Sequence, residues 1–250
     1  MSLFAAFTPI QWVMVFVASF LVGLAKGGLK GVDMLSVTLM AFVFGGKSST
    51  GIVLPLLCMG DIAAVSYYNR HAQWHHFKKI IPWMVIGILI GTFIGKDMNE
   101  IVFRKVMAII VMITIAIVLW MEYRKSTDVP HHPAFAIGTG LTAGITTMIG
   151  NLAGAFSNLY FLAMRVAKNN FIGTAAWIFL CMNLFKLPFQ IFYWKNITLQ
   201  SLRIDAILIP ALALGFLTGV HWVGKIKEER YRKIVLMFTL IGSLMILFRK

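Results

Sequence analysis

The chain has 250 residues, of which 59% are hydrophobic and only 13% are charged, whereas a soluble domain carries about 25% charged residues. This composition excludes a soluble protein and indicates a membrane protein. The formal net charge of +14 does not indicate nucleic-acid binding, because most Lys and Arg residues lie in short turns between apolar segments, where anionic lipid headgroups stabilise them.

Ten apolar segments follow one another along the chain. They cover residues 10–25, 32–45, 50–69, 80–95 and 101–122, and then 134–149, 152–164, 171–193, 203–222 and 231–248. The first lacks the basic start and the cleavage site of a signal peptide, so we expect it to be retained as a helix. The polar connector from Glu122 to Pro133 divides the ten into two groups of five. We therefore expect an all-α polytopic membrane protein with one repeat at 1–125 and a second at 126–250.

The two halves share a pattern that indicates an internal duplication. An offset of 128 residues aligns, without a gap, Ile81-Pro82, Gly87, Gly91, Glu100 and Arg104-Lys105 with Ile209-Pro210, Gly215, Gly219, Glu228 and Arg232-Lys233. Nearer the start of each half, an offset of 122 residues pairs Gly51 with Gly173, Asp61 with Asn183, and Gln73-Trp74 with Lys195-Asn196. The second match is weaker than the first but keeps the same order.

Each half begins with two short segments around a glycine-rich stretch. Gly23 to Gly31 contains four glycines, and Gly144 to Gly154 contains three together with Asn151. Because a spanning helix needs about 20 apolar residues, we expect each short pair to form half-helices that break at membrane depth. Such breaks are typical of transporter binding sites, although glycines also allow close helix packing. An odd number of segments per half gives inverted repeats; a single kinked helix in place of each pair gives parallel ones.

Several of these stretches occur in the order of one known family. They are Gly23 to Gly31, residues 51–61 (GIVLPLLCMGD), Tyr67-Tyr68-Asn69-Arg70-His71, Trp74, Pro82, Gly87, Gly91, Gly173-Thr174-Ala175 and Asn183-Leu184-Phe185-Lys186. Taken together, the chain resembles the sulfite exporter TauE/SafE family over essentially its whole length. The resemblance implies secondary transport of small sulfur-containing anions, such as sulfite or organosulfonates, by two inverted repeats. Lys26 and Lys30 depart from the plainer glycine stretch of many relatives.

Three lysines, Lys26, Lys30 and Lys186, lie at membrane depth. An ionisable group there costs several kcal/mol unless it is hydrated or paired. In the first break, ammonium groups and freed backbone N–H groups suit the three oxygens of a sulfonate or sulfite. The alternative is that the lysines reach out to the membrane interface. The candidate substrate-binding residues are Lys26, Gly27, Gly28, Lys30 and Gly31 in the first half, and Asn151, Ser157, Asn158 and Asn183 in the second.

Asp61 and Lys186 form the second candidate element of the site. Asp61 lies twelve residues into its segment, and its repeat counterpart Asn183 comes one turn before Lys186. Asp61 and Lys186 either meet as a buried pair, or Asp61 is neutral and carries a proton. Asn158 has an alternative role as a helix–helix hydrogen-bond partner. Asp33, after the first break, is expected to cap the short helix that follows.

The sequence contains no nucleophile elbow, phosphate loop or paired carboxylates, so we expect neither an enzyme nor a cofactor. His71, His75 and His76 fall in a basic loop without an acidic or thiolate ligand, and we expect a loop that faces lipid headgroups rather than a metal site. Cys58 and Cys181 lie inside apolar segments and are interpreted as packing residues.

The sequence favours a secondary transporter in the cytoplasmic membrane of a bacterium. Its expected partners are the lipid bilayer, a small sulfur-containing anion bound between the two glycine-rich breaks, and protons as the candidate coupling ion. Two alternatives remain open. One is a pore or a cation-coupled carrier for another small anion, in which Asp61 binds the cation. The other is a membrane scaffold whose polar residues only hold helices together.

Overall fold

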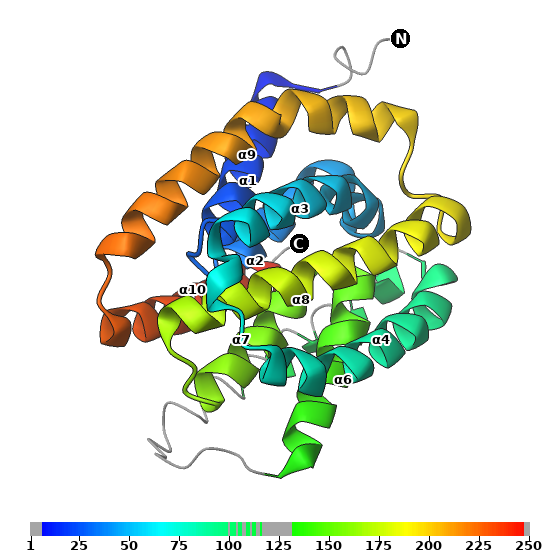
Figure 1. The fold of residues 1–250 in the computed structure, drawn as a ribbon. Helices are drawn as coiled ribbons and strands as arrows, with labels where there is room; N and C mark the ends of the chain where they lie inside the picture. The colour runs from blue at the N-terminus through cyan, green and yellow to red at the C-terminus, as the bar shows by residue number, and fades with distance from the viewer. Residues whose placement is uncertain are drawn as a thin grey trace.

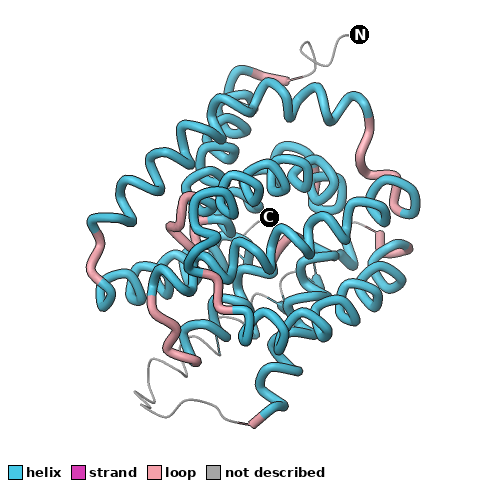
Figure 2. Tube along the Cα trace, viewed as in Figure 1, coloured by secondary structure: helices cyan, strands magenta, loops and turns pink. Residues whose placement is uncertain are grey.

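The computed structural model describes residues 7–99, 101–103, 105–106, 109–110, 112–113, 116 and 132–247. Within this part of the chain every regular element is a helix (Figures 1 and 2), as the sequence predicts. The elements are α1 (Pro9–Lys26), α2 (Asp33–Phe44), α3 (Gly46–Tyr68), η2 (Asn69–His71), α4 (Trp74–Lys96), α6 (Pro133–Gly150), α7 (Ala153–Ala163), α8 (Lys168–Pro188), η3 (Phe189–Tyr193), α9 (Leu199–Lys225) and α10 (Glu228–Leu247). The expected connector and most of segment 101–122 lie outside the described residues.

Five helical stretches of the described chain are long and apolar enough to cross a membrane. They are α1, α4, α9, and the stretches Gly46–His71 and Lys168–Tyr193, in which α3 continues into η2 and α8 into η3. By contrast, α2 has 12 residues and α7 has 11, which is shorter than the roughly 20 residues of a spanning helix. The fold is that of a multi-pass membrane protein in which α2 and α7 are too short to span.

Both glycine-rich stretches contain a helix end. After α1 ends at Lys26, Gly28 and Gly31 have φ angles of +117° and +93°, a conformation that glycine adopts without steric cost. After α6 ends at Gly150, Asn151 has a φ angle of 56°, and asparagine is one of the few other residues that tolerate the left-handed region. The first turn therefore depends on glycine and the second on asparagine.

Two close helix pairs flank the molecule, α1 with α9 and α4 with α6 (Figure 1). In the first pair, a Cβ atom at Gly23, Gly27, Gly215 or Gly219 would overlap backbone atoms of the facing helix. In the second pair, Gly87 and Gly144 have the same role. Glycine allows such close approach between membrane helices, where van der Waals packing supplies much of the attraction. Close packing thus accounts for glycines in both stretches, and turn formation accounts for Gly28 and Gly31 of the first.

Helices α3 and α8 lie between these pairs and run antiparallel (Figure 1). Gly51 near the start of α3 packs against Asn196, which follows the end of the α8 stretch. Reciprocally, Gly173 near the start of α8 packs against His71, which follows the end of α3. The two contacts place the start of each helix at the end of the other.

Near the start of each of the two central helices, α3 and α8, a lysine caps the C-terminal end of a neighbouring helix. Lys47 of α3 donates hydrogen bonds from Nζ to the carbonyls of Lys96 and Met98, at the end of α4. Lys168 of α8 donates from Nζ to two carbonyls at the end of α9, at 3.0 and 2.6 Å. A helix C-terminus has unsatisfied carbonyls and a partial negative charge, so a cation is favourable there. The same contact therefore occurs in both halves of the chain.

The glycine contact between α1 and α9 can be tested with two alanine substitutions in one helix. We expect Gly215→Ala to lower the melting temperature of the purified protein in detergent, because the new Cβ would overlap the backbone of Phe20 in α1. Overpacking of this kind costs about 1–3 kcal/mol. The control is Gly224→Ala, where the space is open and alanine improves helix propensity by about 1 kcal/mol. Equal melting temperatures for the two variants would contradict the close contact.

Candidate functional site

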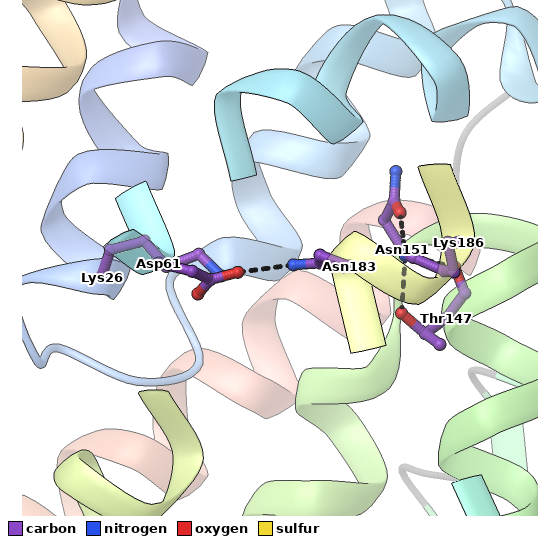
Figure 3. A network of polar contacts seen from close by, with 6 residues as sticks. All are labelled: Lys26, Asp61, Thr147, Asn151, Asn183 and Lys186. Carbon is purple, nitrogen blue, oxygen red and sulfur yellow. Dashed lines mark hydrogen bonds and ion pairs between the residues drawn. The ribbon is translucent and has the colours of Figure 1, made fainter. Parts of the chain in front are cut away.

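A buried ion pair lies where α1, α3 and α8 meet (Figure 3). Lys26 Nζ is 2.5 Å from Asp61 Oδ1, and the Asp61 side chain is fully buried. The second carboxylate oxygen, Oδ2, accepts a hydrogen bond of 2.6 Å from Asn183 Nδ2. Lys26 belongs to the first half of the chain and Asn183 to the second, so each half engages one oxygen of Asp61.

The structure gives Asp61 a different partner from the Lys186 expected from the sequence. Helices α3 and α8 are antiparallel and Asp61 lies opposite Asn183, so Lys186, one turn further along α8, is directed towards α6. Lys186 Nζ donates hydrogen bonds to Thr147 O at 3.1 Å, to Thr147 Oγ1 at 2.9 Å and to Asn151 Oδ1 at 2.8 Å (Figure 3). The repeat match of Asp61 with Asn183 thus locates a contact, but Lys186 has other partners.

The surroundings of Lys186 compensate its charge only in part. All the hydrogen-bond acceptors that the described chain provides for its ammonium group are uncharged. Thr147 lies in the last turn of α6, where the helix dipole presents its negative end. The C-terminal end of α6 therefore stabilises this buried cation without a carboxylate.

The two lysine contacts occupy corresponding places in the halves. Lys26 comes 35 residues before Asp61, and Asn151 comes 35 residues before Lys186. In each case a residue at a helix break contacts a residue on the central helix of the same half. The charges are reversed, because the break supplies the cation in the first half and the central helix supplies it in the second.

Lys30 is the least compensated cation of the first break. Its side chain is buried, at 3% exposure, and its ammonium group lies 5.5 Å from the centre of the Phe179 ring, beside that of Lys26 at 5.1 Å. No hydrogen bond or ion pair to Lys30 Nζ is found within the described part of the chain. An aromatic face stabilises a cation, though more weakly than a carboxylate does. This ammonium group is therefore buried without a direct counter-charge among the described residues.

Most backbone N–H groups of the first break form hydrogen bonds within the break. The N–H groups of Gly27, Gly28, Leu29 and Lys30 all donate to backbone carbonyls. The N–H group of Gly31, which lies between α1 and α2, donates to no backbone carbonyl of the described residues. The N–H groups of Gly27 and Gly28 are therefore engaged within the break, and Gly31, where the sequence places the first freed N–H group, remains the candidate backbone donor.

The polar residues of the second half divide into engaged and unengaged groups. Asn151 is engaged, because its Oδ1 accepts from Lys186 and its Nδ2 donates to Thr50 O at 3.0 Å. Ser157 and Asn158 of α7 are buried, and Ser157 Oγ and both polar atoms of the Asn158 amide lack a hydrogen-bond partner within the described chain. The structure does not join Ser157 or Asn158 to the network in Figure 3.

Asp33 does not cap α2 as the sequence suggested. The N-cap of α2 is Val32, and no side chain caps this helix end. Asp33 is the first residue of α2, and its carboxylate lies against Gly154 in the first turn of α7. This position suits a carboxylate, because the N-terminus of a helix carries partial positive charge.

The histidines and cysteines do not form a metal site in the described part of the chain. His75 and His76 lie in α4 rather than in a loop, and the buried His76 has Nδ1 at 2.9 Å from Tyr160 Oη. Cys58 is buried, Cys181 is half-buried, and neither forms a disulfide.

Sequence reasoning misses two residues. Phe179 contacts the two lysines of the first break, but a phenylalanine in an apolar helix carries no signal of that contact. Asp205 of α9 is 3% exposed, and both carboxylate oxygens lack a hydrogen-bond partner within the described chain. Its signal is that of a single carboxylate inside the apolar segment 203–222.

The pairing of Asp61 can be tested by charge removal and rescue. We expect Asp61→Asn to destabilise the purified protein by several kcal/mol, because Lys26 is then buried without its counter-charge. The double variant Asp61→Asn with Lys26→Met should recover much of this loss in thermal or denaturant unfolding. Asp61→Asn with Lys186→Met should not, since Lys186 has other partners. Rescue by Lys186→Met but not by Lys26→Met would contradict the observed pairing.

Comparisons with known proteins identify the family. The family model "Sulfite exporter TauE/SafE" matches residues 15–246, which is nearly the whole chain. A search of curated proteins and a search of solved structures gave no match. The matched residues include α2 to α9 and most of α1 and α10. The chain therefore belongs to the sulfite exporter TauE/SafE family of membrane transporters.

Proposed function

We propose that the protein is a secondary transporter that moves a small sulfur-containing anion, sulfite or an organosulfonate, across the cytoplasmic membrane of a bacterium. The balance of buried charge around the two helix breaks carries this proposal. Lys26, Lys30 and Lys186 are buried, whereas Asp61 is buried and Asp33 half-buried. Even with both carboxylates counted, one positive charge remains in this region. A surplus cation in a low-dielectric interior strongly favours an anion.

Within this proposal, Lys30 is the principal anion-binding residue. It is buried, its ammonium group lies beside the Phe179 ring, and no carboxylate of the described chain forms an ion pair with it. The neighbouring Gly31 supplies a backbone N–H, and the three oxygens of a sulfonate or sulfite accept several hydrogen bonds at once. Lys26 is less suited to direct binding, because Asp61 already neutralises it.

The second half supplies uncharged donors and the second unpaired cation. Asn151 holds Lys186, and the unengaged amide of Asn158 and hydroxyl of Ser157 are available to a ligand or to water. Buried polar groups without partners are costly, so their retention is explained if an occupant satisfies them during the transport cycle. We therefore propose that the anion passes between the two breaks, with Lys30 on one side and these residues on the other.

We also propose that the two halves, 1–125 and 126–250, are inverted repeats. Three observations support this arrangement. The central helices α3 and α8 run antiparallel with reciprocal end contacts. Lys47 and Lys168 close the ends of α4 and α9 in the same way. The close pairs α1 with α9 and α4 with α6 each combine helices from opposite halves. Under this proposal α2 and α7 are half-helices, as in transporters that bind substrate near the bilayer midplane.

The role of Lys30 predicts a specific loss of affinity. We expect Lys30→Gln to weaken sulfite binding roughly tenfold or more while the melting temperature in the absence of sulfite changes little, because a charge-assisted hydrogen bond is worth about 1.5–3 kcal/mol. Lys30→Met should weaken binding further, since it also removes the donor. Sulfite-dependent thermal shifts measure both affinities.

The control for Lys30 is Lys79→Gln, which removes the same charge from an exposed position of α4. It should leave sulfite binding unchanged. If Lys30→Gln and Lys30→Met bind sulfite as the wild type does, Lys30 is not the anion-binding residue. If sulfite does not shift the melting temperature of the wild type but an organosulfonate does, the organosulfonate replaces sulfite as the proposed substrate. The role of Lys30 is then tested with that anion.

The inverted arrangement predicts opposite accessibility at two matched positions. Asn99 and Lys227 correspond under the 128-residue offset, and both are exposed just beyond α4 and α9. In a chain whose Cys58 and Cys181 are replaced by alanine, we expect Asn99→Cys and Lys227→Cys to react with a membrane-impermeant maleimide from opposite sides of the membrane. Labelling from the same side would indicate parallel repeats.

A further inference from the structure

Asp205 is the buried carboxylate that the proposed anion site does not use. It lies in the spanning helix α9, close to its start. Its side chain is 3% exposed, and neither carboxylate oxygen has a hydrogen-bond partner in the described chain. Asp61, by comparison, has an ion pair on one oxygen and an amide on the other. Among the described residues, Asp61 thus has a partner for each carboxylate oxygen, whereas Asp205 has none for either.

Among the described residues, no counter-charge forms an ion pair with Asp205. The adjacent Ile204, with Leu208 and Leu212 of α9, belongs to an apolar cluster formed with α1, α2 and α3. The titratable groups on α9, on α1, α2 and α3, and at the contact of α8 with the end of α9 are Lys26, Asp33, Lys47, Cys58, Asp61, Tyr67, Tyr68, Lys168, Arg203, His221 and Lys225. None of them forms a hydrogen bond or an ion pair with Asp205.

The ionised form of such a carboxylate is strongly disfavoured, because burial removes its hydration and no hydrogen bond or counter-charge of the described chain replaces it. A proton on Asp205 removes the charge. Ionisation then requires that water or a cation reaches the start of α9, which in turn requires that the apolar cluster around Ile204 opens. Gain and loss of a proton at Asp205 are in this way linked to the packing of α9 on its neighbours.

That packing connects Asp205 with the ion pair. Leu212, two turns or about 10 Å further along α9, lies beside Gly60, the residue before Asp61. Gly215 and Gly219 of the same helix pack directly on α1, which ends in Lys26. A displacement of α9 against α1 would therefore reach the helix break that carries the anion-binding lysines.

We propose that Asp205 is a proton-binding site within the membrane and that the anion transport proposed above is coupled to protons through it. The coupling part rests on the proposed function; proton binding does not. The proton comes from water that enters when the start of α9 opens, and it leaves to water on the same route or on the opposite side of the membrane. Asp61, held by Lys26 and Asn183, is a structural partner in this scheme and not the proton carrier.

Infrared spectroscopy of the purified protein in detergent at neutral pH tests proton binding without any substrate. The carbonyl stretch of a protonated carboxylic acid, which shifts in heavy water, should be present in the wild type and lost in Asp205→Asn. The control Asp97→Asn, which changes an exposed carboxylate after α4, should keep the band. A wild-type spectrum without the band, or an unchanged band in a monodisperse Asp205→Asn protein, would overturn the proposal.

Transport in proteoliposomes tests the coupling. With sulfite as the probe, we expect Asp205→Asn to retain sulfite exchange between the two sides but to lose accumulation driven by a pH gradient, because the amide mimics the protonated acid. Gradient-driven accumulation at the wild-type level by Asp205→Asn would overturn the coupling. If the wild type moves no sulfite at all, the proposed substrate fails, whereas the infrared result still decides whether Asp205 binds a proton.

Discussion

The buried contact of Lys26 with Asp61 is the interaction on which the arrangement of the helices depends. A lysine or an aspartate alone at membrane depth costs several kcal/mol, and a pair is tolerated only with good geometry and with its remaining hydrogen bonds satisfied. These conditions require α1 to end where Lys26 reaches α3, and α8 to cross α3 where Asn183 reaches the second carboxylate oxygen. The first helix break and the crossing of α3 by α8 thus both serve this one buried contact.

The second half repeats this geometry with different chemistry. Asn151 and Lys186 have the same spacing as Lys26 and Asp61, but an amide and helix carbonyls replace the carboxylate. The first pair is neutral as a whole, whereas the second retains a positive charge. The two contacts are therefore electrostatically asymmetric, and under the proposed function this asymmetry leaves positive charge for an anionic substrate.

Sequence patterns predict the helices well because apolar length is decisive in a membrane. The short segment 152–164 corresponds to α7 at Ala153–Ala163, and Asn151 lies at the helix end within the expected second break. Side-chain partners are harder to predict, because a one-turn displacement along an antiparallel helix directs a residue to another neighbour. Lys186 illustrates this, since Asn183 faces Asp61 and Lys186 faces α6. Asp205 was not identified because the sequence does not reveal whether a carboxylate near a helix start has a partner.

Under the proposed function, the partners that each buried lysine already has influence where the anion binds. A substrate at Lys26 would have to displace Asp61, which would leave a buried carboxylate without its partner and offset the gain. The positive end of α7 already faces Asp33, so the second break offers little further attraction there. Among the described residues, Lys30 has the Phe179 ring beside its ammonium group and no ion-pair partner, and a cation–π contact is weaker than an ion pair with a carboxylate. A transporter must release its substrate as well as bind it, and a weakly held cation meets both conditions. Under the proposed function, the first break, at Lys30 and Gly31, is therefore the more suitable of the two for an anion that binds and leaves in every cycle.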